Sequence, residues 1–458
     1  MSDRKWTRRT FNKTLLATAA GGWACGGDGN KSRPKPAGRQ EPQGVILITA
    51  DDLGWKDVGA YGLQTIATPS MDRLVAEGIS FDFAFDVVST CSSSRATYAT
   101  GQYPHTHGVT GLVHRHPELS LPSDRDTVIR ALKDAGFRTG IQGKWHLSAV
   151  EQPDSFGFDQ YIATPIDQVI RDSVDALAFL ERRIDDRFYL ELNYMQPHRD
   201  IYGNYPQEAG YEVDVDEAVP PEWWGLPNWP EIREEVAGYF SRVLWMDALI
   251  GEILDGLDEL GMADNTLIAF ISDNGPAFPS CKTTLYDRGV GTPLMFRWPA
   301  VLTPARHDDL VSSVDLAPTM LDLAGLDPLP DAQGRSIAPL LLGEEGWEPA
   351  EALFSEMERH TGEIPARAIR TRQYKYIRNL TDKPWGSGSG GSWKDELALE
   401  PEQTFDEPRP PEQLFDLDAD PLERDNLVDD PGHAEVLADL RARLDAHMEA
   451  TDDPRLGE

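Results

Sequence analysis

Four apolar segments of strand length constrain the fold most, because each runs directly into polar residues. They are residues 44–50 (GVILITA), 139–143 (TGIQG), 187–195 (RFYLELNYM) and 266–272 (TLIAFIS). Helical segments, with capping residues in front and glycine behind, lie between them at 69–78 and 123–136. Strands that alternate with helices predict an α/β fold with a large, mostly parallel sheet flanked by helices.

The polar residues that follow these strands form candidate metal ligands. Because the carboxyl ends of parallel strands meet at one edge of a sheet, we expect these side chains to gather there. The oxygen ligands among them are Asp51, Asp52, Asp273 and Asn274. An aspartate pair after one strand is also typical of a helix cap or turn. Together with the second cluster, however, it favours a hard cation, Ca²⁺ or Mg²⁺.

Basic residues are expected at the same edge, although the chain as a whole is strongly acidic. The formal net charge of the 458 residues is −34, which argues against nucleic acid or an anionic membrane as a partner. The expected cationic lining consists of Arg95, Lys144, His146, His198 and Lys282. A cation with basic side chains around it is suited to binding a tetrahedral oxyanion.

Four further histidines occur in HTHGVTGLVHRH, residues 105–116. Their spacing matches no established zinc pattern. We interpret His105 and His107 as loop or pocket-wall residues, and His114 and His116 as residues that line a substrate entrance.

The amino terminus predicts export. Residues 1–43 start with a basic segment that contains Arg8 and Arg9, continue with a short stretch rich in Ala and Gly, and end in a Pro-rich linker. This pattern is typical of a twin-arginine signal and is too short for a transmembrane span. A lipid anchor attached to Cys25 is an alternative. The residues before it, Gly-Trp-Ala, fit a lipoprotein cleavage site poorly, however. We therefore expect a periplasmic or extracellular protein.

Two cysteines remain after this segment, Cys91 and Cys281. An exported protein could bridge them in a disulfide. Cys91 stands in TCSSSRATYATG, where small hydroxyl residues and Arg95 precede a helix-like run that ends at Gly101. The cysteine therefore has two interpretations from the residues alone, half of a disulfide or part of the polar edge.

Residues 350–458 predict a smaller C-terminal subdomain after a catalytic domain at 44–345. Segments 352–357, 367–379 and 412–417 alternate like strands of an antiparallel sheet, and 433–450 is an amphipathic helix. Glu356, His360 and Glu363 are candidates for sugar contacts, although a solvated loop is the interpretation that we favour for each. The insertion at 382–396 is flexible by composition.

The motifs CSSSRATYATG, ITADDLG, GKWH, MQPH, SDNG and LFDLDADPLERDNL together resemble those of sulfatases of the alkaline-phosphatase-like superfamily. The resemblance covers the chain from about residue 44 to its end. Within the family, SDNGPAFPSCKTTLYDRGVGTPL and RAIRTRQYKYIRNLTDKPW are most similar to the sulfamidase subgroup, the heparan N-sulfatases that release sulfate from N-sulfoglucosamine.

The resemblance implies that Cys91 is oxidised to formylglycine by a formylglycine-generating enzyme, so that it takes no part in a disulfide. The hydrated aldehyde supplies the nucleophilic oxygen in such enzymes. The resemblance also implies a calcium site formed by Asp51, Asp52, Asp273, Asn274 and the modified Cys91. The family motif usually has proline two residues after the cysteine, whereas this chain has Ser93. This difference bears on how efficiently the maturing enzyme acts.

The resemblance further implies roles for the basic residues. Arg95 is expected to stabilise the hydrated aldehyde, and Lys144 to hold a sulfate oxygen. Asp273 is expected to help deprotonate the attacking hydroxyl. His198 with Lys282 is expected to protonate the leaving amine or alcohol. His146 is then expected to take the proton of the second hydroxyl, which releases sulfate.

The expected activity is hydrolysis of a sulfated saccharide, with N-sulfoglucosamine at a glycan end as the first candidate. An O-sulfatase acting on sugar or aryl sulfates is the nearest alternative. A phosphodiesterase or phosphatase of the same superfamily normally needs two metals and a Ser or Thr nucleophile, which the cysteine motif disfavours. A non-catalytic glycan-binding protein remains the alternative if Cys91 is unmodified.

Overall fold

The computed structural model describes residues 39–150, 152–162, 169–385 and 407–458. The predicted signal segment and most of the 382–396 insertion lie outside these residues. Eight strands form the main sheet in the spatial order β4-β3-β5-β1-β6-β7-β2-β8. All of them run in one direction except β7, which is antiparallel to both neighbours. The predicted mostly parallel α/β sheet is therefore confirmed. The strands are β1 Gly44–Asp51, β2 Ile79–Phe85, β3 Arg138–Gly143, β4 Gln160–Ile162, β5 Phe188–Pro197, β6 Thr266–Ser272, β7 Met295–Arg297 and β8 Ala305–Ser312.

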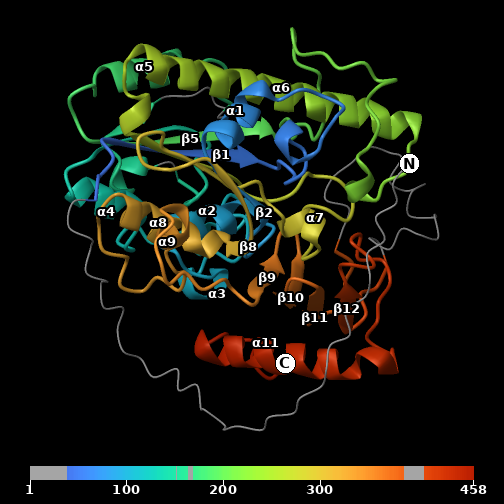
Figure 1. Cartoon of the computed structure of the whole chain (residues 1–458). Coiled ribbons are helices and arrows are strands. Elements are labelled where there is room, and N and C mark those ends of the chain that lie inside the picture. The colour runs from blue at the N-terminus through green and yellow to red at the C-terminus, as the bar shows by residue number, and fades with distance from the viewer. Residues whose placement is uncertain (1–38, 151, 163–168, 386–406) are drawn as a thin grey trace, which may run out of the picture. The chain divides into compact units, whose positions relative to one another are not determined.

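Helices cover both faces of this sheet (Figure 1). Strand β1 shows why, since its side chains alternate between the faces. Ile46 and Ile48 pack in one apolar core with α1, α5 and α6, whereas Val45 and Leu47 pack in the other with α2, α4 and α8. The helices are α1 Pro69–Glu77, α2 Cys91–Thr100, α3 Pro104–His107, α4 Val128–Asp134, α5 Val174–Glu181, α6 Pro230–Glu259, α7 Asp287–Val290, α8 Leu316–Leu323 and α9 Ala338–Leu341.

Helix α4 is shorter than the segment 123–136 predicted. It begins at Val128, because the side chain of Thr127 accepts a hydrogen bond from the amide of Arg130 and so caps the first turn. The serine and aspartates ahead of it in the sequence lie outside the helix. Helix α2 ends as expected, at Gly101 in the left-handed conformation with φ 67°.

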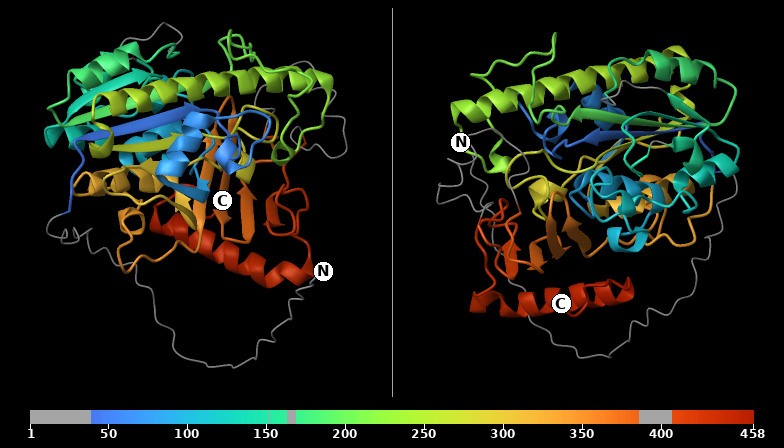
Figure 2. Two further views of the ribbon diagram at one scale, coloured as in Figure 1. Left: turned by 45° about the horizontal axis from the view of Figure 1, so that its top comes forward. Right: turned by 180° about the vertical axis from the view of Figure 1, so that it is seen from behind.

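The C-terminal part forms the predicted second, antiparallel sheet, in the order β12-β11-β10-β9. Its elements are β9 Leu353–Arg359, β10 Glu363–Arg370, β11 Tyr374–Asn379, β12 Glu412–Asp416 and the helix α11 Ala434–Ala450. The predicted boundary near residue 350 falls between α9 and β9. In Figure 2, α11 packs along one side of this small sheet, where Leu440 and Leu444 meet Ile369 and Tyr376.

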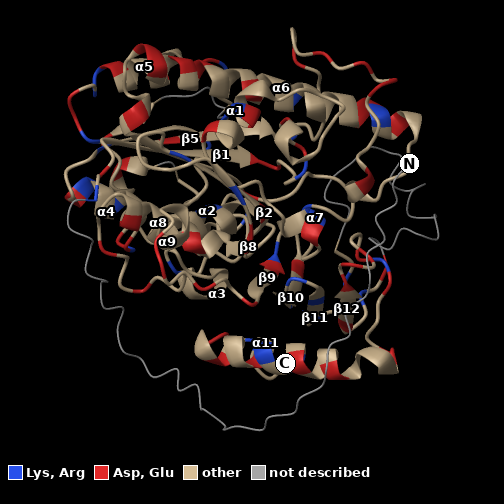
Figure 3. Cartoon of the chain, viewed as in Figure 1, with Lys and Arg blue, Asp and Glu red and all other residues tan. Residues whose placement is uncertain are grey.

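Acidic residues occur on most exposed elements, including α5, α6 and α11 (Figure 3). No helix within the described ranges is both long and apolar enough to cross a bilayer.

A buried ion network joins the two sheets. The carboxylate of Asp287, on α7, accepts hydrogen bonds from Arg370 of β10 at 3.0 Å and pairs with Lys375 of β11 at 2.5 Å. Glu423 also pairs with Lys375, at 2.9 Å. These cations hold the pKa of Asp287 well below its usual value even though burial opposes ionisation. The network therefore ties the C-terminal sheet to the main domain.

Replacing Asp287 by alanine should lower the free energy of unfolding by ~3–5 kcal/mol, because two buried cations lose a partner. Denaturant unfolding measures this change. Asp308→Ala is the matched control, since Asp308 pairs with Arg372 at the surface and should change stability little. Equal effects of the two substitutions would contradict a structural role for the buried network.

Candidate active site

The polar clusters meet at one edge of the main sheet because their four strands are neighbours. Strands β3, β5, β1 and β6 lie side by side and run parallel. Their carboxyl ends deliver four clusters to one place: Lys144 and His146 after β3, His198 after β5, Asp51 and Asp52 at the end of β1, and Asp273 and Asn274 after β6. Residues up to 222 positions apart in sequence thus come into contact, as the hydrogen bond between Asn274 and Asp52 shows.

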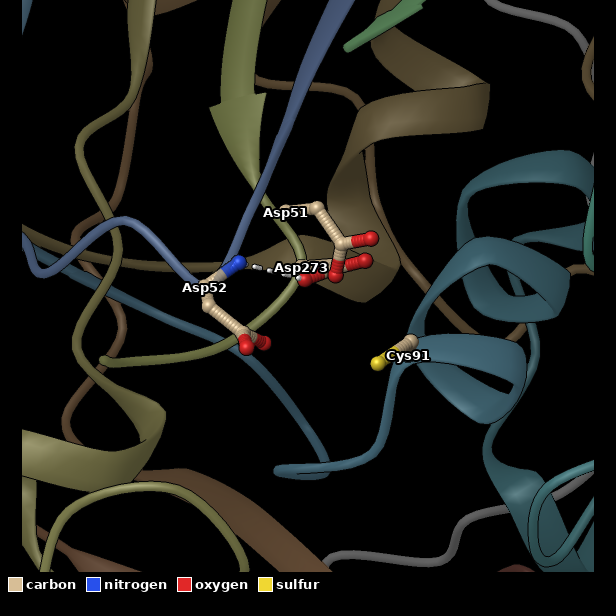
Figure 4. A group of neighbouring side chains, drawn as sticks. All are labelled: Asp51, Asp52, Cys91 and Asp273. Carbon is tan, nitrogen blue, oxygen red and sulfur yellow. Dashed lines mark hydrogen bonds between the residues drawn. The ribbon is translucent and has the colours of Figure 1, made fainter. Parts of the chain in front are cut away.

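Three buried carboxylates form the centre of the site together with Cys91. Asp51, Asp52, Asp273 and Cys91 each offer one atom to a group in which all lie within 4.8 Å of one another. Figure 4 shows the Sγ atom of Cys91 on the side of α2 that faces the carboxylates. The buried oxygens Asp51 Oδ1, Asp52 Oδ2 and Asn274 Oδ1 have no hydrogen-bond partner among the described residues. Because unpartnered buried oxygens are costly, this oxygen-rich set fits a calcium or magnesium ion.

The backbone at Asp52 is held in an uncommon conformation. Its φ of 71° lies in the left-handed region, which non-glycine residues seldom adopt. The amide of Asp52 donates to Asp273 Oδ1 at 3.2 Å, and the next amide donates to Ser272 Oγ at 2.9 Å. Backbone strain of this kind gathers at functional sites, where neighbouring contacts hold it in place. Here it turns two successive aspartates, Asp51 and Asp52, toward one space.

Cys91 is the first residue of α2 and is buried at the floor of the site. Its Sγ accepts a hydrogen bond from Lys282 Nζ at 3.2 Å. Burial raises the pKa of the Cys91 thiol to about 12, despite the charges of Lys144 and Lys282. Cys91 and Cys281 are both free, so the disulfide interpretation is wrong. An unmodified Cys91 is therefore a neutral thiol at neutral pH, which is a weak nucleophile.

Ser93 occupies the first turn of α2, where backbone amides have no acceptor within the helix. Its hydroxyl is buried and has no hydrogen-bond partner in the described part of the chain. Proline is tolerated in a first helical turn because no amide hydrogen bond is lost there. The difference between Ser93 and the proline of the family motif therefore requires no change in the backbone.

Each carboxylate of the cluster has a cationic partner. Arg95, one helical turn after Cys91, donates to Asp273 at 2.9 Å. Lys144 pairs with Asp51, and Lys282 pairs with Asp52. Burial opposes the charge on Asp51, but nearby cations, chiefly Lys144, hold its pKa well below the usual value.

The pKa of Asp273 is shifted in the other direction from that of Asp51. Burial and repulsion by Asp51 raise it to about 6, although Arg95 opposes the shift. Two carboxylates in one cluster thus differ in their affinity for a proton, which is typical of acid–base sites.

A cavity of about 490 Å³ opens above this cluster. Its lining includes four of the chain's ten histidines and four Lys or Arg residues, against two aspartates. These residues are His114, His146, His198, His360, Arg115, Lys144, Arg199, Lys282, Asp52 and Asp200. The cavity is therefore cationic inside an acidic chain, as an anionic ligand requires.

The histidines of the cavity differ in their contacts. His146 Nε2 lies 3.0 Å from Nδ1 of His114, whose ring is stacked beside it. Burial and the charge of Lys144 hold the pKa of His146 well below its usual value, so that this imidazole is neutral and can accept a proton. His198 Nε2 lies 3.8 Å from Asp52 Oδ2. Burial lowers its pKa as well.

The other histidines predicted to line a pocket or its entrance fall in different places. His107 is buried, and its Nε2 lies 3.2 Å from Oγ1 of Thr97. His116 lies 3.4 Å from Glu118, whereas His114 does line the cavity.

The solvated-loop interpretation is wrong for Glu356, whereas His360 does lie in a loop and is partly exposed. Glu356 is buried on β9, where its carboxylate accepts from the His105 amide at 2.8 Å and lies 2.5 Å from the His105 ring. His360, at the turn between β9 and β10, lines the cavity of about 490 Å³ above the carboxylate cluster, which we call the catalytic cavity. Glu363 is exposed and pairs with Arg359 at 3.3 Å. Arg115 lines the cavity without having been predicted, and only its position beside His114 in the sequence hinted at it.

Comparison with known proteins agrees with this geometry. A model of the sulfatase family matches residues 43–326, which hold every predicted metal-ligating and catalytic residue. The chain belongs to the sulfatase family. A second model, described as the C-terminal part of N-sulphoglucosamine sulphohydrolase, matches residues 280–386. The protein is thus a hydrolase of sulfate esters or sulfamates.

Individual relatives of this sulfatase cover nearly the whole chain. Human N-sulphoglucosamine sulphohydrolase is 30% identical over 91% of this chain and 92% of its own length. Human arylsulfatase A is 28% identical over 88% of this chain and 89% of its own. A solved structure of a protein in complex with its substrate D-glucosamine-2-N,6-O-disulfate shares the fold, with a TM-score of 0.70 and 21% identity over 92% of this chain and 100% of that one.

Proposed function

We propose that this sulfatase releases sulfate from an N-sulfated glucosamine at the end of a glycan, with formylglycine formed from Cys91 as its nucleophile. One observation carries the choice of substrate. Residues 280–386, which match the N-sulphoglucosamine sulphohydrolase model, contribute Lys282, His360 and Thr361 to the cavity above Cys91. The part of the chain that resembles an N-sulfatase is thus the part that would contact the sugar.

The side chains of the site support sulfate transfer. Formylglycine at position 91, when hydrated, supplies the attacking oxygen. Arg95 lies one turn along α2 and holds Asp273 in place. Lys144 and Lys282 neutralise charge on the sulfate oxygens, since a sulfated substrate is a stable anion that must be stabilised before attack.

Proton transfer falls to different groups of the site. Neutral His146 accepts a proton. Protonated Lys282, with His198 near it beside Asp52, donates to the leaving nitrogen or oxygen. A calcium ion, or magnesium in its place, held by Asp51, Asp52, Asp273 and Asn274 would add further charge neutralisation.

An exo mode of action follows from the charge distribution. The acidic surface repels a long sulfated polymer, whereas the cationic cavity attracts a single terminal residue. Its volume of about 490 Å³ lies in the range of small-molecule sites. A sulfated monosaccharide or the end of a short oligosaccharide is therefore the preferred substrate.

A substrate panel tests the proposal. N-sulfoglucosamine should be hydrolysed with a kcat/KM about 100-fold or more above that of 6-O-sulfated N-acetylglucosamine and of an aryl sulfate, because a site built to hydrogen-bond one group rejects ligands that lack it. Sulfate release is measured under identical conditions. Activity on the O-sulfated compounds with none on the sulfamate would refute the N-sulfatase proposal and leave the family assignment intact.

An O-sulfatase is the second candidate, favoured by the 28% identity to human arylsulfatase A. A phosphatase or phosphodiesterase is disfavoured, because Cys91 stands at the head of α2, where those enzymes normally have a Ser or Thr nucleophile. A non-catalytic glycan-binding protein requires an unmodified Cys91, which mass spectrometry of the purified chain reveals.

Export is part of the proposal. Arg8 and Arg9 in the basic amino terminus favour the twin-arginine route, which carries folded proteins and so allows oxidation of Cys91 before export. Fractionation of host cells into cytoplasm and periplasm, for the natural chain and for a variant with both arginines replaced by lysine, distinguishes this route from retention in the cytoplasm.

A further inference from the structure

A second cavity, of about 230 Å³, lies between loops of the main domain and the edge strand β12 of the C-terminal sheet. We call it the β12 cavity. In the described chain it shares no lining residue with the catalytic cavity. Its charged lining residues are three arginines, Arg288, Arg409 and Arg424, and two glutamates, Glu407 and Glu423, and Trp385 lines it as well. Interfaces between packed parts of a protein are common places for ligand sites.

The buried guanidinium of Arg409 forms no ion pair with a carboxylate of the described residues, although Asp382 attracts it from beyond ion-pair distance. Only 5% of the residue is exposed. Its Nε donates to the carbonyl of Lys383 at 2.6 Å, and one terminal nitrogen donates to Asn379 Oδ1 at 2.8 Å. The other terminal nitrogen is buried, and among the described residues it has no hydrogen-bond partner and the guanidinium has no carboxylate within ion-pair distance. A buried, unpaired cation is costly, and burial lowers the pKa of Arg409 to about 10.

Trp385 adds a second unpartnered donor to the same cavity. The guanidinium of Arg409 stacks over its ring at 4.0 Å, and the residue is only 5% exposed. Its indole nitrogen is buried and lacks a hydrogen-bond partner in the part of the chain that the structure describes. Buried donors are nearly always paired in proteins, with protein atoms, water or a ligand. Two adjacent orphaned donors therefore indicate an acceptor that binds beside the stacked pair.

The lining has three arginines against two glutamates, Glu407 and Glu423, and is therefore cationic by one charge. Arg288 donates to the carbonyl of Ser280 at 2.8 Å and to that of Leu422, and within the described ranges it forms no ion pair. Glu423 is already neutralised by Lys375, at 2.9 Å. Its other oxygen accepts from the backbone of Asp287, at 2.6 Å.

We propose that the β12 cavity is a second oxyanion site, which takes a sulfate or carboxylate group beside the stacked side chains of Arg409 and Trp385. Both side chains offer only donors, and the neighbouring Arg288 adds attraction without offering an acceptor. The anion is either free sulfate, which the enzyme itself produces, or the acidic group of a saccharide bound outside the catalytic cavity.

The cavity also adjoins the loop that carries Lys282. Ser280, which accepts from Arg288, belongs to that loop, and Thr283 donates to the carbonyl of Trp385 at 3.3 Å. The positive φ values of Ser280 and Thr283, 62° and 73°, show that this loop is tightly constrained. The proposed oxyanion site thus adjoins the loop that carries Lys282.

Crystals of the full chain soaked in selenate, a heavy analogue of sulfate, test the proposal site by site. We expect an anomalous peak beside the stacked Arg409 and Trp385, separate from any peak near Cys91. A parallel soak of the Cys91→Ala variant with N-sulfoglucosamine distinguishes the sources. Sugar density with its sulfate at Arg409 identifies a saccharide, and selenate alone identifies the free anion. Absence of both from the β12 cavity overturns the proposal.

Sulfate titration by calorimetry extends the test to solution. Trp385→Phe keeps the ring but removes the N–H, and should weaken the second binding event about tenfold, as expected for loss of one charge-assisted hydrogen bond. Arg409→Gln should abolish that event. If Arg409→Gln fails to fold, the sulfate affinity of Trp385→Phe still tests the proposal. Arg372→Gln, which removes an exposed arginine of the same subdomain, should leave binding unchanged. Unchanged affinity in Trp385→Phe, or a peak in crystals without binding in solution, overturns the proposal.

Discussion

Replacement of Cys91 by alanine should lower the rate of sulfate release by about 10⁴-fold or more, as removal of a covalent nucleophile does in other hydrolases. The side chain is small and lies at the first position of α2, where alanine is readily accommodated. The fold should therefore survive, which circular dichroism and thermal unfolding check. Protein from a host that contains a maturing enzyme should also yield an aldehyde-bearing peptide at position 91, which the variant lacks.

Cys281→Ala is the matched control. Cys281 is also a free, buried cysteine, with a pKa raised to about 12 by burial, but it does not line the catalytic cavity. Its loss should leave kcat close to that of the natural chain. Full activity in Cys91→Ala would end the formylglycine mechanism, whereas equal losses in the two variants would point to general damage.

The edge of the main sheet was predictable because it depends on local patterns. Four apolar segments each ended in polar residues, and parallel strands bring such ends together whatever lies between them. The order of β3, β5, β1 and β6 as neighbours was not needed for this prediction. It explains, however, why Lys144 and Asp51 pair directly across the sheet edge.

Contacts between distant segments were not predictable. Glu356 lies in a segment predicted as a strand, and its charge favoured exposure to solvent. It is buried because the amide and ring of His105, 251 positions away, satisfy its oxygens. The contact between His114 and His146 likewise joins two segments without any shared pattern. Pairing of this kind depends on tertiary packing, which spacing along the chain does not encode.

The burial of Arg409 at the β12 cavity was not predictable from the sequence either. Arg409 stands in a polar, Pro-rich stretch that predicts an exposed loop. Its burial follows from stacking on Trp385 and from hydrogen bonds to the end of β11. That this buried cation has no ion pair with a described carboxylate becomes visible only when the surrounding side chains are placed.

Removal of the metal should abolish activity, and calcium should restore it, since the cluster at the sheet edge offers oxygen ligands for a hard cation. Asp52→Ala and Asn274→Ala should each weaken calcium retention by about 100-fold or more, because even residues that only support a ligand contribute about 10–100-fold. Metal content by mass spectrometry after dialysis against a chelator measures the loss without reference to activity.

The two variants separate metal binding from charge pairing. Asp52 also pairs with Lys282, so its loss leaves this lysine without that partner. Asn274, in contrast, carries no charge and contributes an oxygen that no described residue contacts by a hydrogen bond. A shared loss of calcium in both variants therefore reports the ion itself. Asp57→Asn is the control, since Asp57 is an equally buried carboxylate that accepts from Trp223 and Tyr239 at 2.9 and 2.8 Å and lies outside the cluster. Active protein that contains zinc and needs neither calcium nor magnesium would contradict the ligand assignment, because an all-oxygen set is a poor match for zinc.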